Sequence, residues 1–130
     1  MKLLLDTHTL LWLASGDAKL TQPARTAIAD SANTLTISVA TIWELAIKTT
    51  KPQNPLTLSD PLDVYLAKVL PTYGIEVLPI QQAHALGVMA LPDHHRDPFD
   101  RIMIAQAICE GMTLVSGDGH ASSYPVPLIW

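Results

Sequence analysis

Short apolar runs alternate along this chain with longer stretches in which apolar and polar residues mix at helical spacing. The short runs predict strands and the longer stretches predict helices. The predicted strands are residues 2–5, 35–37, 75–78, 113–115 and, as a last edge strand, 128–129. The predicted helices are residues 10–14, 21–31, 38–48, 62–70, 81–89 and 98–110. Such alternation indicates an α/β fold with a mostly parallel central sheet of four to five strands and helices on both faces.

Residues that favour helix ends and turns separate these elements. Thr7-His8-Thr9 is expected to be a turn between the first strand and the helix that begins at Leu10. Asp97 is expected to cap the helix whose first residue is Pro98, and Gly111 to end it. No repeat or linker interrupts the pattern, so residues 1–130 are predicted to form one domain.

Composition narrows the class of protein. Of the 130 residues, 48% are hydrophobic and 15% are charged, as in a globular chain. A formal net charge of −4 argues against strong sequence-independent binding to nucleic acid. It does not exclude a nuclease, because bound cations reverse the local field of an acidic cluster. The chain has one cysteine, Cys109, so it cannot form an intrachain disulfide. Asp6 and His8 interrupt the apolar N-terminal run, which argues against a signal peptide. A cytoplasmic protein without a membrane helix is therefore expected.

Two acidic residues follow predicted strands directly. Asp6 follows the first strand and Asp118 follows the strand at 113–115. Functional groups in such folds gather beyond the carboxyl ends of the strands. Each residue also has an ordinary structural explanation, because Asp6 can cap a helix and Asp118 can belong to a turn at residues 116–119.

Glu44 lies in a stretch that is apolar on most sides. It can form a surface pair with Lys48, four residues on. If the helix is largely buried, the carboxylate instead needs a partner or a cation.

Asp97 and Asp100 compete for one chemical role. Asp97 is assigned to structure, as the helix cap and as an ion-pair partner of Arg101. Asp100 shares a helical face with Ile104 and Ala107 and is expected to point inward, toward the sheet. Stabilisation of the helix dipole remains the alternative explanation for Asp100.

The histidines do not favour a zinc site. His94 and His95 are adjacent in a loop, and adjacent histidines rarely bind one ion. His84 and His120 are too isolated in the sequence to complete a ligand set.

Four segments resemble the motifs of PIN-domain ribonuclease toxins of the VapC type, from VapBC toxin–antitoxin systems. They occur in the family's order over essentially the whole chain. They are Leu4-Leu5-Asp6-Thr7-His8, Ser38 to Lys48 around Trp43-Glu44, His95-Arg96-Asp97-Pro98-Phe99-Asp100-Arg101, and Leu114-Val115-Ser116-Gly117-Asp118. The chain departs from the family in the proline-rich residues 51–59 and at Ser116, where threonine is usual.

This resemblance implies a three-layer α/β/α sandwich and a magnesium-dependent endoribonuclease, the toxin of a type II toxin–antitoxin system. Its acidic positions fall on Asp6, Glu44, Asp100 and Asp118. The implied partners are RNA as substrate, a small VapB-like antitoxin and a second copy of the chain in a homodimer, and the implied cofactor is Mg²⁺ or Mn²⁺. Trp12 and Tyr65, on two predicted helices, are candidate antitoxin contacts unless they fill the core.

The residue types suggest how these groups would work. Mg²⁺ takes one or two carboxylates directly and keeps several waters, so Asp6 and Asp100 are expected to bind it directly. Glu44 and Asp118 would act through waters or hold a second ion. A metal-activated water would then hydrolyse the phosphodiester, with Thr7, Thr41 and Ser116 orienting water or phosphate oxygens.

Two other classes of protein fit the sequence less well. A receiver-like module needs a phosphoacceptor aspartate on a middle strand, and the strand taken as the middle one, residues 35–37, ends in Ser38 instead. An inert binding module on the same fold is disfavoured because all four acids are kept.

Overall fold

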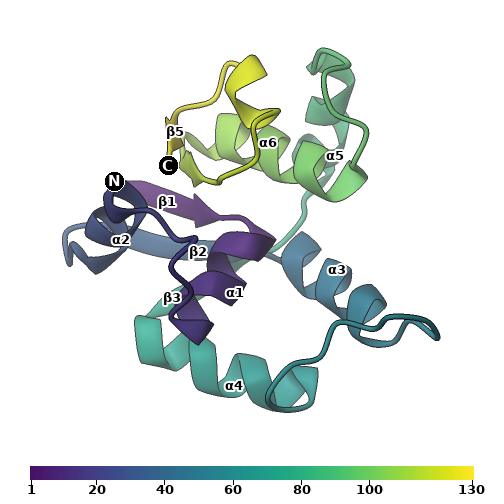
Figure 1. Cartoon of the computed structure of the whole chain (residues 1–130). Coiled ribbons are helices and arrows are strands. Elements are labelled where there is room, and N and C mark those ends of the chain that lie inside the picture. The colour runs from purple at the N-terminus through teal and green to yellow at the C-terminus, as the bar shows by residue number, and fades with distance from the viewer.

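A computed structural model describes all residues, 1–130, as five strands and the helices that connect them (Figure 1). The strands are β1 (Lys2–Leu5), β2 (Thr34–Ser38), β3 (Ile75–Leu78), β4 (Thr113–Val115) and β5 (Leu128–Ile129). The helices are α1 (Thr7–Ser15), α2 (Gln22–Ala29), α3 (Val39–Thr49), α4 (Leu62–Tyr73), α5 (Gln82–Gly87) and α6 (Pro98–Glu110), with 3₁₀ turns at Val88–Ala90 and Ala121–Ser123. None of these helices is both long and apolar enough to cross a bilayer.

All five strands are parallel, in the order β3-β2-β1-β4-β5. This confirms the predicted parallel α/β sheet. The central strand is β1, however, so the expectation that residues 35–37 form the middle strand is wrong. The middle strand ends at Asp6, and the argument drawn from Ser38 against a receiver-like module therefore fails.

Helices cover both faces of the sheet. Leu3 and Leu5 of β1 point to one face, where a core cluster also includes Leu10 of α1 and Ile28 of α2. Leu4 points to the opposite face, where the core includes Met103, Ile104 and Ala107 of α6. This alternation of side chains along a strand places β1 between two apolar cores. The helix α3 lies at the carboxyl edge of the sheet, toward which the β1 arrow points in Figure 1.

The first helix begins earlier than expected. Thr7-His8-Thr9, predicted as a turn, is the first turn of α1, because the Asp6 side chain accepts a hydrogen bond from the Thr9 backbone N–H and caps the helix directly. The other boundaries differ by a few residues, most visibly in α4, which continues to Tyr73 and ends at Gly74 in a left-handed conformation. Strand β1 thus passes into a helix with Asp6 at the junction.

Candidate active site

Three carboxylates from separate parts of the chain line one cavity at the carboxyl edge of the sheet. Asp6 ends β1, Asp118 follows β4 and Asp100 lies in the first turn of α6. The cavity has a volume of about 340 Å³. The rest of its lining consists of His8, Trp12, His95, Gly117 and His120. Adjacent parallel strands therefore bring Asp6 and Asp118 together, and α6 adds Asp100 from the layer above.

Asp6 caps a helix and also lines the cavity. One carboxylate oxygen, Oδ1, accepts the Thr9 backbone N–H at 2.9 Å. The residue is only 6% exposed, and its own backbone N–H continues the sheet by donating to the Val115 carbonyl at 3.2 Å. The helix-cap explanation for Asp6 is therefore confirmed, and its Oδ2 is left for other partners in the cavity.

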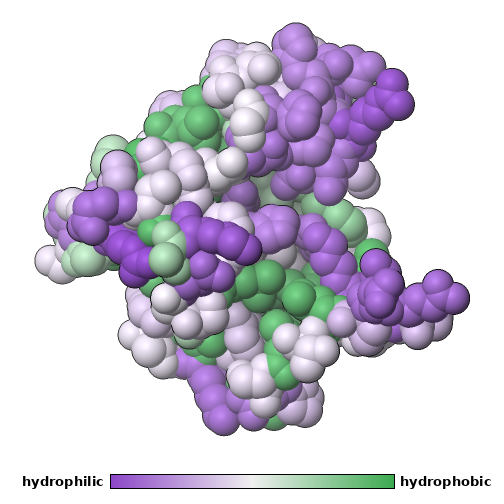
Figure 2. Space-filling view, viewed as in Figure 1, coloured by the Kyte–Doolittle hydropathy of each residue, from purple (hydrophilic) through white to green (hydrophobic).

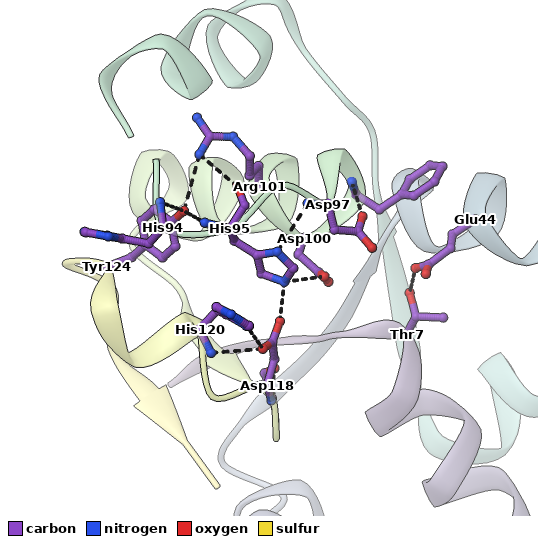
Figure 3. Close-up of polar contacts among 12 residues, drawn as sticks. Thr7, Glu44, His94, His95, Asp97, Asp100, Arg101, Asp118, His120 and Tyr124 are labelled. Carbon is purple, nitrogen blue, oxygen red and sulfur yellow. Dashed lines mark hydrogen bonds and ion pairs between the residues drawn. The ribbon is translucent and has the colours of Figure 1, made fainter. Parts of the chain in front are cut away.

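Glu44 lies on α3 next to this group but does not line the cavity. It is buried, with 4% of the residue exposed. Its Oε1 accepts the Thr7 hydroxyl, and its Oε2 lies 2.6 Å from Nζ of Lys48 (the Thr7 contact is drawn in Figure 3). The pair with Lys48 and the buried carboxylate, treated as alternatives in the sequence, occur together.

The imidazole of His95 bridges Asp100 and Asp118. Its Nε2 lies 2.9 Å from Oδ2 of Asp100 and 2.6 Å from Oδ2 of Asp118 (Figure 3). The Asp97 backbone N–H donates to Nδ1 at 3.2 Å, so the ring proton belongs on Nε2, which donates to the carboxylates. In this metal-free arrangement His95 is a hydrogen-bond donor that holds two acids together. The ligand atoms of His95, Asp118 and His120 also lie within 4.8 Å of one another, close enough to hold a metal ion if the imidazole gives up its proton.

His120 also contacts Asp118. Oδ1 of Asp118 accepts the His120 backbone N–H at 2.9 Å and lies 3.1 Å from Nδ1 of the same residue. The rings of His95 and His120 lie 4.7 Å apart, whereas His94 packs on Tyr124 instead. The expectation that His120 is isolated is therefore wrong, because the fold brings it to the same carboxylate as His95.

The pKa values of Asp100 and Asp118 move in opposite directions. The pKa of Asp100 is raised to about 7, first by burial and then by the neighbouring acids Asp97, Asp118 and Glu44, while His95 lowers it. Burial also raises the pKa of the Asp118 carboxyl, but hydrogen bonds from His120 and His95 more than offset this, and the pKa lies below its ordinary value. At neutral pH Asp118 is ionised, while Asp100 binds a proton readily unless a cation compensates its neighbours.

Asp97 is the helix cap that the sequence predicted. Its Oδ1 accepts the Phe99 backbone N–H at 2.9 Å. The predicted ion pair between Asp97 and Arg101 is wrong. Arg101 donates instead to the carbonyls of Pro92, His95 and Val88 and to the Tyr124 hydroxyl. These bonds anchor the loop that carries His95.

The three hydroxyl residues expected to support the acids form hydrogen bonds within the protein. Thr7 donates to Glu44 and lies 3.2 Å from the Thr41 hydroxyl. The buried hydroxyl of Thr41 also contacts Sδ of Met103 at 3.5 Å. The Ser116 hydroxyl accepts the Asp118 backbone N–H at 3.1 Å and so shapes the turn that carries Asp118.

A second hollow, of about 640 Å³, lies between α1, α4 and residues 56–60. Its apolar floor is visible as green atoms between the positions of α1 and α4 in Figure 2. Trp12 is partly buried there, but Tyr65 is only 7% exposed and packs mainly in the core. The remaining apolar lining is Leu11, Ala14, Leu56, Leu58 and Val69.

The sequence did not identify His95 and His120 as members of the acidic site. Their spacing offered a signal in retrospect, since His95 lies two residues before the cap Asp97 and His120 two residues after Asp118. Only the meeting of two loops turns that spacing into contact.

Residues 3–126 match the family model described as "PIN domain". No curated protein matches the sequence. Among solved structures, a chain of DNA-bound VapBC from Salmonella typhimurium is similar with a TM-score of 0.66 and 19% identity, covering 98% of this chain and 96% of the other. A chain of VapBC2 from Rickettsia felis, bound to a promoter DNA fragment, has a TM-score of 0.64 and 18% identity, with coverages of 98% and 97%. A chain of FitAcB from Neisseria gonorrhoeae has a TM-score of 0.64 and 17% identity, with coverages of 97% and 95%.

Proposed function

We propose that this chain, which belongs to the PIN-domain family, is a metal-dependent endoribonuclease and the toxin of a type II toxin–antitoxin pair. The observation that carries this proposal is the meeting of Asp6, Asp100 and Asp118 in one cavity. Nuclease activity is general in the family, and several structural neighbours are toxin–antitoxin complexes. In this proposal residues 1–130 form a single PIN domain that acts in the cytoplasm.

The donor atoms of the site fit Mg²⁺ or Mn²⁺. Both ions prefer oxygen ligands, and the cavity offers carboxylates while His95 presents a donor N–H rather than a lone pair. We assign direct binding to Asp6 and Asp100, and binding through waters or to a second ion to Glu44 and Asp118. When bound, the ion activates water and stabilises the charge that develops on the phosphate.

The protein's own groups have distinct tasks in this proposal. Asp118, whose pKa is lowered, stays ionised and preserves a negative site. Asp100, whose pKa is raised to about 7 first by burial and then by neighbouring acids, releases its proton when a cation enters and compensates the negative charge. His95 holds a proton at Nε2 between the carboxylates of Asp100 and Asp118 and fixes their positions relative to each other. Thr7 orients Glu44 through its hydroxyl.

The small antitoxin is proposed to bind in the hollow between α1 and α4. This surface combines an apolar floor with Lys48, Asp60 and Lys68 at its edges, which suits an amphipathic segment. A basic antitoxin side chain that reaches the acidic cavity would also compete with the cation. Antitoxin partners of structural neighbours support this assignment.

Self-association is proposed for the outer face of α3. Val39, Trp43 and Ile47 recur every four residues on this helix and are 38%, 59% and 45% exposed. Such an apolar stripe is typical of a helix that packs against a partner. Light scattering should report a homodimer, and Trp43→Lys should convert it to a monomer.

One pair of variants tests the nuclease assignment. Purified protein should cleave single-stranded RNA with Mg²⁺ or Mn²⁺ and lose activity in EDTA. Asp100→Asn should reduce the rate on the order of 10²-fold or more, since it removes a ligand to the ion. Asp97→Asn is the matched control, because asparagine also caps a helix, at a cost of roughly a few tenths of a kcal/mol in stability.

Two results would contradict the proposal. Undiminished cleavage in EDTA would exclude metal dependence, and an inactive Asp97→Asn beside an active Asp100→Asn would reverse the two assignments. For the toxin role, expression of the chain alone should arrest growth while expression of Asp6→Asn should not. Healthy growth at high levels of metal-loaded wild-type protein would contradict that role and leave the nuclease chemistry standing.

A further inference from the structure

An aromatic wall borders the acidic cavity. His8 and Trp12 lie one turn apart on α1, with ring centroids 5.5 Å from each other. Both residues line the same cavity of about 340 Å³ as Asp6, Asp100 and Asp118. His8 is exposed and Trp12 is only partly buried, so neither residue is fully accounted for by core packing.

Trp130 supports this wall from behind. Its ring centroid lies 5.6 Å from that of Trp12. A Cβ atom added at Gly117 would come within 2.7 Å of the Trp130 ring, so the indole packs directly on the turn that carries Asp118. Trp130 therefore contacts both Trp12 and Gly117, and it fixes the position of Trp12 relative to the turn that carries Asp118.

The cavity contains few groups that attract a phosphate chain. No lysine or arginine lines it, and His8, His95 and His120 are its only basic side chains. The whole chain carries a net charge of −4. Proteins that neutralise phosphates gain affinity by releasing counterions, and this surface offers little of that gain. Lys19, whose Nζ lies 5.8 Å from the Trp12 ring centroid, and a bound cation would attract phosphate, and contacts to the bases would add to the affinity that these charges provide.

Aromatic rings supply such contacts. Stacking of a base on an aromatic side chain contributes about 1–3 kcal/mol and requires an unpaired base with a free face. Because both rings line the same cavity as the acids, one nucleotide can place its base on Trp12 while its phosphate lies near the acids.

Resting on the proposed function, we infer that His8 and Trp12 form a subsite that stacks an unpaired base next to the scissile phosphate. The substrate is then single-stranded RNA at the cleavage site. Trp130 and Gly117 are positioning residues for this subsite, because they hold Trp12 against the turn that bears Asp118.

The test compares a short single-stranded RNA that the wild-type protein cleaves once with the same RNA carrying an abasic nucleotide beside the cleavage site. For wild type, removing the base should lower kcat/KM about 5- to 150-fold, the equivalent of one stacking contact. In Trp12→Leu, which keeps apolar bulk without an aromatic face, the ratio between the two substrates should fall close to one. Trp12→Phe should restore most of the ratio.

A matched control and a binding measurement complete the design. Tyr73→Leu also exchanges an aromatic residue for leucine, at a partly exposed position outside the cavity, and should keep the wild-type ratio. Fluorescence anisotropy in EDTA should give the same ratios for the dissociation constants, independently of cleavage. Circular dichroism on each variant separates a lost subsite from a lost fold.

The outcomes distinguish this subsite from the nuclease assignment. Cleavage by wild type with equal rates on intact and abasic RNA, or an unchanged ratio in a folded Trp12→Leu, would overturn the subsite and leave the nuclease intact. An effect of Trp12→Leu confined to antitoxin binding would also overturn it. If wild type neither cleaves nor binds the RNA, the proposed function fails and the subsite with it.

Discussion

Asp100→Asn should stabilise the metal-free protein while it lowers the rate of cleavage. Asp100 has a pKa raised from 3.8 to about 7, first by burial and then by Asp97, Asp118 and Glu44. A carboxyl whose pKa is raised by folding binds its proton more tightly in the folded state than in the unfolded state. The free energy of unfolding therefore falls as the pH rises from about 3.8 to about 7, and the full penalty is present above that range.

The size of the effect follows from the same values. At about 1.4 kcal/mol per pH unit, a rise from 3.8 to about 7 corresponds to an upper limit of about 4 kcal/mol. The Asp100 side chain is 27% exposed, and solvent screening reduces this figure. We therefore expect roughly 2 kcal/mol of stabilisation for Asp100→Asn at pH 8 in EDTA, because asparagine keeps the shape and removes the charge.

Urea denaturation in EDTA at pH 8 and at pH 4 measures this difference. At pH 4 the native Asp100 is protonated, so the two proteins should be of nearly equal stability. At pH 8 the variant should have the higher midpoint. Millimolar Mg²⁺ should then raise the midpoint of wild type but not that of Asp100→Asn, since only wild type gains binding energy in the folded state.

Two results would refute the reasoning. If Asp100→Asn is no more stable than wild type at pH 8, the ionised Asp100 carboxylate does not destabilise the metal-free folded state. If the variant is more stable by the same amount at pH 4, the gain does not come from charge. Asp97→Asn is the matched control and should show no pH-dependent gain.

Three further predictions concern the neighbourhood of the site. Gly117→Ala should lower the free energy of unfolding by about 1–3 kcal/mol in urea titrations, because its Cβ would meet the Trp130 ring at 2.7 Å. In a background of Trp130→Ala, most of that penalty should disappear. Lys48→Met should lower the free energy of unfolding in EDTA by about 1–2 kcal/mol, because the buried Glu44 carboxylate loses one partner. Lys48→Arg keeps a positive charge and should lower it less. Equal urea midpoints for the two variants would contradict this prediction. His95→Ala should cost about 1–3 kcal/mol in EDTA, and Mg²⁺ should recover more stability in this variant than in wild type, because the cation then supplies the compensation that the imidazole N–H gave the two carboxylates.

Local chemistry made several features predictable from the sequence. An apolar run that ends in an aspartate indicates a strand end that can cap a helix, and Asp6 lies at such a junction, although α1 begins at Thr7 and not after a turn at Leu10. Asp97 before Pro98 likewise indicated the start of α6, and the inward face of that helix followed from the spacing of Asp100, Ile104 and Ala107. These signals extend over a few residues, within the range of helix caps and side-chain periodicity.

The alternation of strands and helices also predicted the parallel sheet and both helical layers. It did not predict the order of the strands. Placing β1 at the centre depends on which apolar faces pack together, and that is a property of the whole core rather than of any segment. The sequence therefore predicted that Asp6 ends a strand, but only the fold shows that this strand lies between β2 and β4.

The remaining features of the site depend on contacts between residues distant in the chain. His95 reaches Asp118 across 23 positions because Arg101 and Tyr124 anchor its loop. Trp130 packs on Gly117 because β5 returns beside β4. The sequence by itself determined the acids, the caps and the alternation of elements, since each is encoded in neighbouring residues. Tertiary structure alone decided which histidine bridges the acids and which aromatic rings face the cavity, because those choices follow from long-range packing that no local pattern contains.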